Sequence, residues 1–103
     1  MTLKEFKNLK PGILLRFKEE HQQKDVKKFY RWMLGFGQFN AIPSRHGVML
    51  VTECIAKQRP PSNMLPDFNG TVKLHFVNAD GKTGYGFIYL ANKEMIDALE
   101  IVQ

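Results

Sequence analysis

Hydrophobic and polar residues alternate along several short stretches of the chain, and this period of two is typical of strands that bury one face. The first stretch, residues 13–18, follows the turn sequence Lys-Pro-Gly at residues 10–12. Its apolar side chains share one face, and these are Ile13, Leu15 and Phe17. We predict a half-buried strand here and further strands over residues 47–57, 71–77, 85–90 and 99–102.

The last three of these strands make up the second half of the predicted sheet. Residues 71–77 and 85–90 form a predicted hairpin, because the connection between them contains Asp80-Gly81. In the return strand, we expect the small aliphatic face in the core and the aromatic face (Tyr85, Phe87 and Tyr89) to be covered by the helix described next. The core face consists of Gly86, Ile88 and Leu90.

Residues 24–34 change from the period of a strand to that of a helix. The apolar residues that fall on one predicted face are Val26, Phe29, Tyr30 and Met33. Cations repeat the same spacing on another face, and these are Lys24, Lys27, Lys28 and Arg31. At about 100° per residue, the two faces lie roughly 160° apart. We therefore predict an amphipathic helix that begins near Asp25, ends at Gly35 and has one basic side.

The remaining segments are predicted to be connections and one helical turn. Glycines interrupt residues 35–43, and prolines interrupt residues 58–70, so both are expected to be loops. Within the first loop, Phe36 and Phe39 are expected to fold back onto the core. Residues 93–99 are predicted to form a short helical turn that Asn92 caps. Residues 47–57 are apolar on both faces near their start, which indicates a central strand.

The amino-acid composition indicates the class of protein. The chain has 103 residues, 44% of them hydrophobic and 24% charged, which is typical of one globular domain spanning residues 1–103. No apolar run approaches the roughly 20 residues that cross a bilayer, so we expect no membrane insertion. The first residues lack the apolar core of a secretory signal, and a lone Cys54 fits a reducing compartment. We therefore expect a cytoplasmic protein.

Net charge is +5, and its distribution is uneven. Residues 1–33 hold nine basic and four acidic side chains, whereas residues 67–103 hold three and five. A localised positive surface attracts polyanions, whereas evenly mixed charge mainly supports solubility. The basic side of the helix at 24–34 accounts for four of the front cations, so it is the first candidate for a binding surface.

The order of predicted elements resembles the small SH3-like barrels, including the KOW and Tudor-type modules. The residues that carry the resemblance are Leu9-Lys10-Pro11-Gly12-Ile13, Gly47-Val48-Met49-Leu50-Val51, the hairpin at 71–90 and Leu99-Glu100-Ile101-Val102. The segment 19–46 is longer than the usual first loop of such barrels. The resemblance implies an α+β domain, built on a small bent antiparallel barrel with one inserted basic amphipathic helix.

A second resemblance implies a different fold. Gly84-Tyr85-Gly86-Phe87-Ile88-Tyr89 is similar to the ribonucleoprotein motif of RNA-recognition domains, whose aromatics stack bases on an open sheet. Thr83 stands in place of the motif's basic residue, and Leu90 in place of its final aromatic. This alternative implies an RNA-recognition-like α/β sandwich.

The function expected from these patterns is binding. A basic helix face suits phosphate contacts, and an aromatic residue beside it suits base stacking, so nucleic acid (DNA or RNA) is the first expected partner. The candidate residues are Lys24, Lys27, Lys28, Arg31, Trp32, Arg45, Lys73 and Tyr85. The alternative is a protein-interaction or inhibitor module, of the kind phages and mobile elements encode, which docks on an acidic surface with Trp32 as anchor.

Catalytic chemistry is not expected. The histidines and Cys54 lack the short-range ligand pairs of zinc sites, so no metal or cofactor is predicted. A nucleophile made of Cys54 and His75 across neighbouring strands is conceivable, but a buried inert cysteine is the ordinary outcome. There is no Gly-x-Ser-x-Gly elbow and no phosphate-binding glycine loop. Sequence therefore predicts that the protein is not an enzyme.

Overall fold

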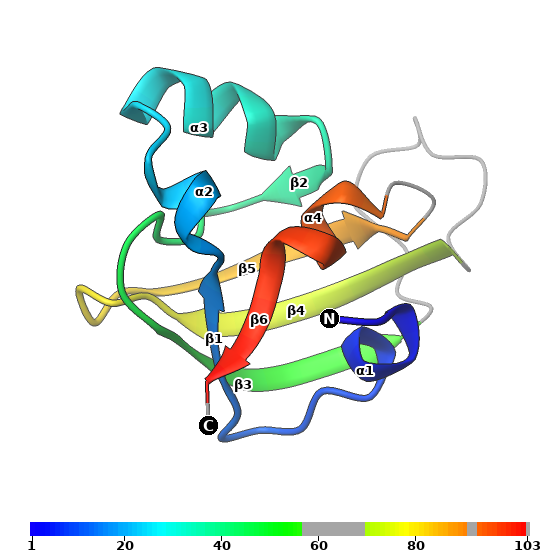
Figure 1. Cartoon of the computed structure of the whole chain (residues 1–103). Coiled ribbons are helices and arrows are strands. Elements are labelled where there is room, and N and C mark those ends of the chain that lie inside the picture. Colours follow the sequence, from blue (N-terminus) through cyan, green and yellow to red (C-terminus); the bar gives the residue numbers. More distant parts are fainter. Residues whose placement is uncertain (57–69, 91–92, 103) are drawn as a thin grey trace.

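A computed structural model of the chain describes residues 1–56, 70–90 and 93–102, which fold into an α+β domain around one antiparallel sheet (Figure 1). The sheet has six strands in the order β2-β5-β4-β3-β1-β6, and it curls strongly into an open half-barrel. The strands are β1 (Leu14–Phe17), β2 (Gly37–Phe39), β3 (Met49–Ala56), β4 (Thr71–Val77), β5 (Thr83–Tyr89) and β6 (Leu99–Val102).

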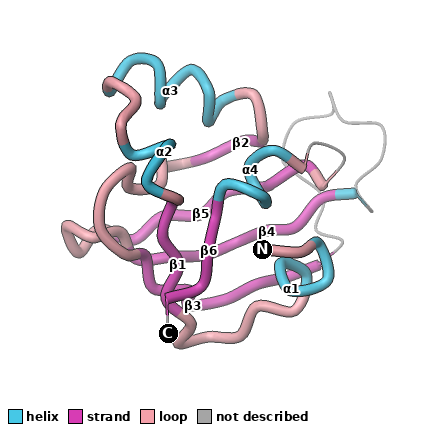
Figure 2. The backbone as a smooth tube through the Cα atoms, in the orientation of Figure 1, coloured by secondary structure: helices cyan, strands magenta, loops and turns pink. Residues whose placement is uncertain are grey.

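The described helices are short, and Figure 2 shows them around the sheet. They are α1 (Leu3–Lys7), α2 (Glu19–Gln22), α3 (Val26–Leu34) and α4 (Glu94–Ala98). The predictions of the strands near 13–18, 47–57, 71–77, 85–90 and 99–102, and of the helices near 24–34 and 93–99, are confirmed. Strand β3 is central, as expected, since it lies between β4 and β1.

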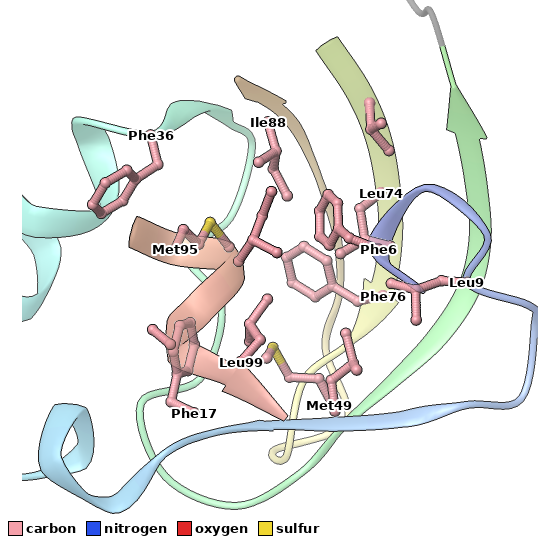
Figure 3. Packing of buried hydrophobic residues seen from close by; sticks show 14 of the residues in the cluster. Phe6, Leu9, Phe17, Phe36, Met49, Leu74, Phe76, Ile88, Met95 and Leu99 are labelled. Atoms are coloured by element: carbon pink, nitrogen blue, oxygen red, sulfur yellow. The ribbon is translucent and has the colours of Figure 1, made fainter. Parts of the chain in front are cut away.

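The core fills the concave side of the sheet (Figure 3). Every second residue of β4 points inward, as predicted, and each partner on β5 is small or aliphatic: Leu74 lies opposite Gly86, and Phe76 opposite Gly84. The helices close the open side with apolar residues that include Phe6, Phe29, Met33, Met95 and Ile96. Full burial of one such side chain contributes about 1.5–3 kcal/mol before the entropy of ordering it is subtracted.

A bulge in β3 changes which of its residues face the core. Val51 lies opposite Phe76, but the next pair is Glu53 with His75, so Thr52 is an extra residue in the strand. Strict alternation would have put Glu53 on the same side as Val51. The bulge instead turns Glu53 to the convex side and places Cys54 opposite the buried Leu74. Alternation along residues 47–57 predicts Cys54 on the face of Leu50 and Glu53 on the face of Val51, and this prediction is wrong beyond residue 51.

Three short elements lie where none was predicted. Strand β2 forms inside the expected loop at 35–43, because Gly37 allows its backbone to approach that of Phe87 on β5. Helix α1 begins with a capping box, in which Thr2 and Glu5 each accept from the other's backbone N–H. Helix α2 occupies the polar stretch after β1. The predicted cap at Asn92 and most of the predicted loop at 58–70 lie outside the described residues.

The aromatic face of β5 is not covered by α3. Helix α3 packs with the core that contains Ile88, whereas Tyr85, Phe87 and Tyr89 alternate with Ile88 and face the opposite side. The expected cover is therefore wrong. Phe87 is nevertheless only 6% exposed, and the sheet has six strands instead of four, so the described fold is not an open base-stacking sheet of the RNA-recognition type.

Candidate functional site

Helix α3 is the element on which most predicted site residues meet, and it begins and ends close to the residues predicted from the sequence. The Asp25 carboxylate accepts a hydrogen bond from the Lys28 backbone N–H at 2.8 Å and so caps the first turn. Gly35 ends the helix. Phe29 and Met33 are buried against the core, which sets the side that faces solvent.

The solvent side of α3 carries three exposed cations, Lys27, Lys28 and Arg31. The Lys28 ammonium lies 4.0 Å from the Asp25 carboxylate, and both side chains are more than half exposed, so this ion pair contributes little. Among the described residues, no ion pair involves Lys27 or Arg31. The cations are therefore available to an external anionic group.

Beside the cations runs a row of exposed apolar side chains, which we call the α3 ridge: Val26, Tyr30 and Leu34. Their exposed fractions are 69%, 50% and 48%, and their spacing of four residues places them along one line of the helix. At about 100° per residue, this line falls between the packed side and the cations. The sequence pattern places Val26 and Tyr30 on one apolar face with Phe29 and Met33, which predicts that all four pack on the core, and for Val26 and Tyr30 this prediction is wrong.

The sequence does not predict the α3 ridge, because periodicity gives the direction of an apolar stripe but not how much of its width a neighbouring element covers. Here the sheet and the neighbouring rings cover only the Phe29, Trp32 and Met33 side of the helix. Leu34 is not part of the predicted apolar face, although it continues the spacing that starts at Val26 and Tyr30.

Trp32, the expected stacking residue, lies in an aromatic cluster of its own molecule. Its ring contacts those of Phe17, Phe29 and Phe36 at centroid distances between 4.9 and 5.9 Å. Its indole N–H donates to the Glu94 carboxylate at 2.9 Å. These contacts give Trp32 a packing role in the junction between α3, β1 and α4.

Two further predicted cations make contacts near the start of α3. The Lys24 ammonium lies 5.2 Å from the centroid of the Trp32 ring, within cation–π range. The Arg45 guanidinium donates a hydrogen bond to the Lys24 backbone carbonyl, which ties the segment after β2 to the start of α3. Both side chains are half-buried, so they are less accessible than Lys27 and Arg31.

Lys73 and Tyr85 lie on a separate surface, the convex face of the β4–β5 hairpin. The Lys73 ammonium is 4.7 Å from the Tyr85 ring centroid and 5.3 Å from that of Phe87. His75 neighbours Tyr85 and lies 3.9 Å from the Glu53 carboxylate. The eight predicted residues therefore fall into a helix group and a hairpin group, with no described contact between the two.

The position of Cys54 does not pair it with His75 as a nucleophile would require. It lies opposite Leu74 in the sheet register, whereas His75 lies opposite Glu53, so Cys54 and His75 face opposite sides of the sheet. Burial raises the pKa of the Cys54 thiol, and its Sγ lies 3.6 Å from the Phe6 carbonyl oxygen. Within the described ranges, no group of three or more metal-ligating side chains occurs.

A polar hollow of about 290 Å³ lies beside β1 and is lined by Arg16, Glu19, Gln22 and Glu100. Arg16 and Glu100 pair at 2.7 Å, so these two charges of the hollow already satisfy each other.

In the part of the chain that the structure describes, no helix is long and apolar enough to span a bilayer.

Comparison of the chain with protein-family models, with curated proteins and with solved structures found no match. A function can therefore be inferred only from the geometry of the molecule itself.

Proposed function

We propose that the protein is a small protein-docking module, which inserts the α3 ridge into an apolar groove of a partner whose rim is acidic. The observation that carries the proposal is the exposure of Val26, Tyr30 and Leu34 in one line, directly beside Lys27 and Arg31. Helix-in-groove recognition uses apolar anchors at such spacings.

The two halves of this surface have different physical tasks. Moving apolar side chains out of water lowers the free energy, and tyrosine is among the residue types that most often dominate binding energy. The cations attract an acidic rim, which raises the association rate and rejects partners of the wrong charge. Phosphate contacts alone would make no use of Val26 and Leu34, so the ridge favours a protein partner over a nucleic acid.

The scaffold in this proposal is an SH3-like barrel. The support is the order in which the chain builds the sheet: β1, then the meander β3-β4-β5, then α4 and a closing strand, β6, that pairs with β1. Segment 18–48, which holds α2, α3 and β2, would be the insertion that carries the docking helix. In this proposal the barrel positions α3 and has no catalytic task.

The test is affinity purification from cells that naturally contain the protein, with nuclease present throughout. Val26→Ser with Leu34→Ser should lower recovery of a stoichiometric protein complex by about tenfold or more, because two apolar anchors are lost. The matched control is Leu14→Ser with Leu50→Ser, which removes exposed apolar side chains from the sheet and should leave recovery unchanged. Equal recovery with both double variants would refute the proposal.

Nucleic-acid binding remains a second candidate, because three exposed cations lie within five positions of α3 with only Asp25 nearby. Tyr30 would then replace Trp32 as the stacking residue, since its ring is half exposed. Such binding would weaken steeply with salt, by a slope set by the number of phosphates contacted.

Fluorescence anisotropy with labelled DNA and RNA oligonucleotides separates the two candidates. If the second candidate holds, Lys27→Glu with Arg31→Glu should abolish binding to every sequence, and Val26→Ser with Leu34→Ser should have little effect. If instead no oligonucleotide binds at low salt, the second candidate is eliminated.

A further inference from the structure

His21 and Trp32 form a stacked pair that joins α2 to α3. Their ring centroids are 4.8 Å apart, and the ring planes differ by 13°. The His21 side chain is only 15% exposed. Because Trp32 also contacts Phe17 and Phe36, the stack links the docking helix to the strand β1 and to the loop before β2.

The imidazole of His21 is poorly placed to carry a charge. Its Nδ1 is buried and has no hydrogen-bond partner among the described residues. Its Nε2 lies 3.5 Å from the exposed Glu20 carboxylate. Burial lowers the pKa of His21, and the Lys24 and Lys18 ammonium groups lower it further, while Glu20 and Glu94 oppose them.

We propose that the His21–Trp32 stack is a pH-sensitive latch, which holds α3 against the half-barrel when His21 is neutral and loosens when His21 is protonated. A proton on the ring would place a charge in a largely buried position, at a nitrogen that lacks an acceptor among the described residues, and near Lys24. The consequence that docking weakens in acid rests on the proposed function, but the latch itself belongs to the free chain.

The direction of the pH dependence follows from linkage. A histidine whose pKa is lowered by folding binds protons more readily in the unfolded chain, so protonation favours the unlatched state. The latch is fully stabilised above the ordinary histidine pKa of about 6.5 and weakens progressively as the pH falls below it. The change therefore lies at the acidic side of neutrality.

Trp32 is the single tryptophan of the chain, so tryptophan emission reports on the surroundings of this one ring. The experiment follows the emission of the free protein, and its quenching by acrylamide, from about pH 8 to about pH 5. We expect acrylamide quenching to rise about twofold or more as the latch loosens, with a midpoint below about 6.5. Quenching by acrylamide reports access to the ring, so an effect of imidazolium charge on emission alone would not reproduce it.

Two variants and one control keep the test decisive. His21→Gln and His21→Phe both remove the titrating group, and the second retains a ring that can stack, so at least one should fold. Both should make acrylamide access to Trp32 independent of pH. The control His46→Gln, at an exposed position, should show the same pH dependence of acrylamide access as the original chain. A flat wild-type profile, or an unchanged transition in both His21 variants, would overturn the latch. No partner is present, so neither result depends on whether α3 docks.

Discussion

At the scale of single residues, Tyr30 and Trp32 have opposite environments although they are two positions apart on one helix. Trp32 is enclosed by rings of its own molecule, and its N–H is satisfied by Glu94. Tyr30 is half exposed, and no aromatic contact of its ring is found within the described ranges. The same residue class therefore stabilises the fold at one position and is available for binding at the other.

Alanine substitutions separate these two roles. Trp32→Ala should lower the free energy of unfolding by about 2–3 kcal/mol, since it removes a half-buried ring from an aromatic cluster. Tyr30→Ala should change it by less than about 0.5 kcal/mol, because little packing is lost. Urea unfolding followed by circular dichroism measures both. Equal losses of stability would show that the two environments have been assigned wrongly.

Gly37 lies where the backbone of β5 leaves no room for a side chain. A Cβ at this position would lie 2.2 Å from the Phe87 carbonyl oxygen, so Gly37→Ala should detach β2 or push it from β5. We expect a loss of about 2 kcal/mol or more in the free energy of unfolding, measured in urea.

The control for Gly37 is Gly35→Ala. Gly35 has an ordinary φ of −75°, and a Cβ there would meet the Trp32 carbonyl oxygen at 3.3 Å. The Gly35 variant should therefore change the free energy of unfolding by less than about 1 kcal/mol. A Gly37 variant as stable as the Gly35 variant would contradict the described pairing of β2 with β5.

At the scale of elements, the sequence predicts where α3 lies and which of its faces is apolar, but not how much of that face the rest of the fold covers. Asp25, Gly35 and the apolar spacing predict where the helix begins and ends, because capping and periodicity are local properties. Which part of the stripe stays exposed depends on segments far along the chain, such as β1 and α4. The bulge at Thr52 and the pairing of β2 are likewise set by partner strands, so alternation alone missed them.

The cap at Asp25 is testable at this scale. Asp25→Ala removes the acceptor of the Lys28 N–H and should lower the free energy of unfolding by about 1 kcal/mol. Asp25→Asn keeps an oxygen acceptor and removes only the charge, so it should lose clearly less. Differential scanning fluorimetry ranks the variants, and equal losses for the Asn and Ala variants would show that the carboxylate acts through its charge and its weak ion pair with Lys28 instead of through the cap.

At the scale of the whole molecule, the half-barrel separates two charged surfaces. The hairpin group of Lys73 and Tyr85 is internally paired through cation–π contacts, whereas the Lys27 and Arg31 side chains on α3 have no ion-pair partner among the described residues. The sequence predicted the cations of both groups but placed them in one site, because residue spacing carries no information on which strands and helices become neighbours. Three exposed cations of the front third, Lys27, Lys28 and Arg31, thus reach solvent beside an apolar ridge.

The most direct measurement of the docking claim is cross-linking from the ridge in living cells. A photo-reactive phenylalanine analogue placed at position 30 should yield an adduct of one discrete protein mass that resists nuclease. Lys27→Glu with Arg31→Glu should remove this adduct, and the same analogue at position 14, which is 36% exposed on the sheet, should not form it. An adduct that disappears with nuclease, or none from position 30, would contradict the account.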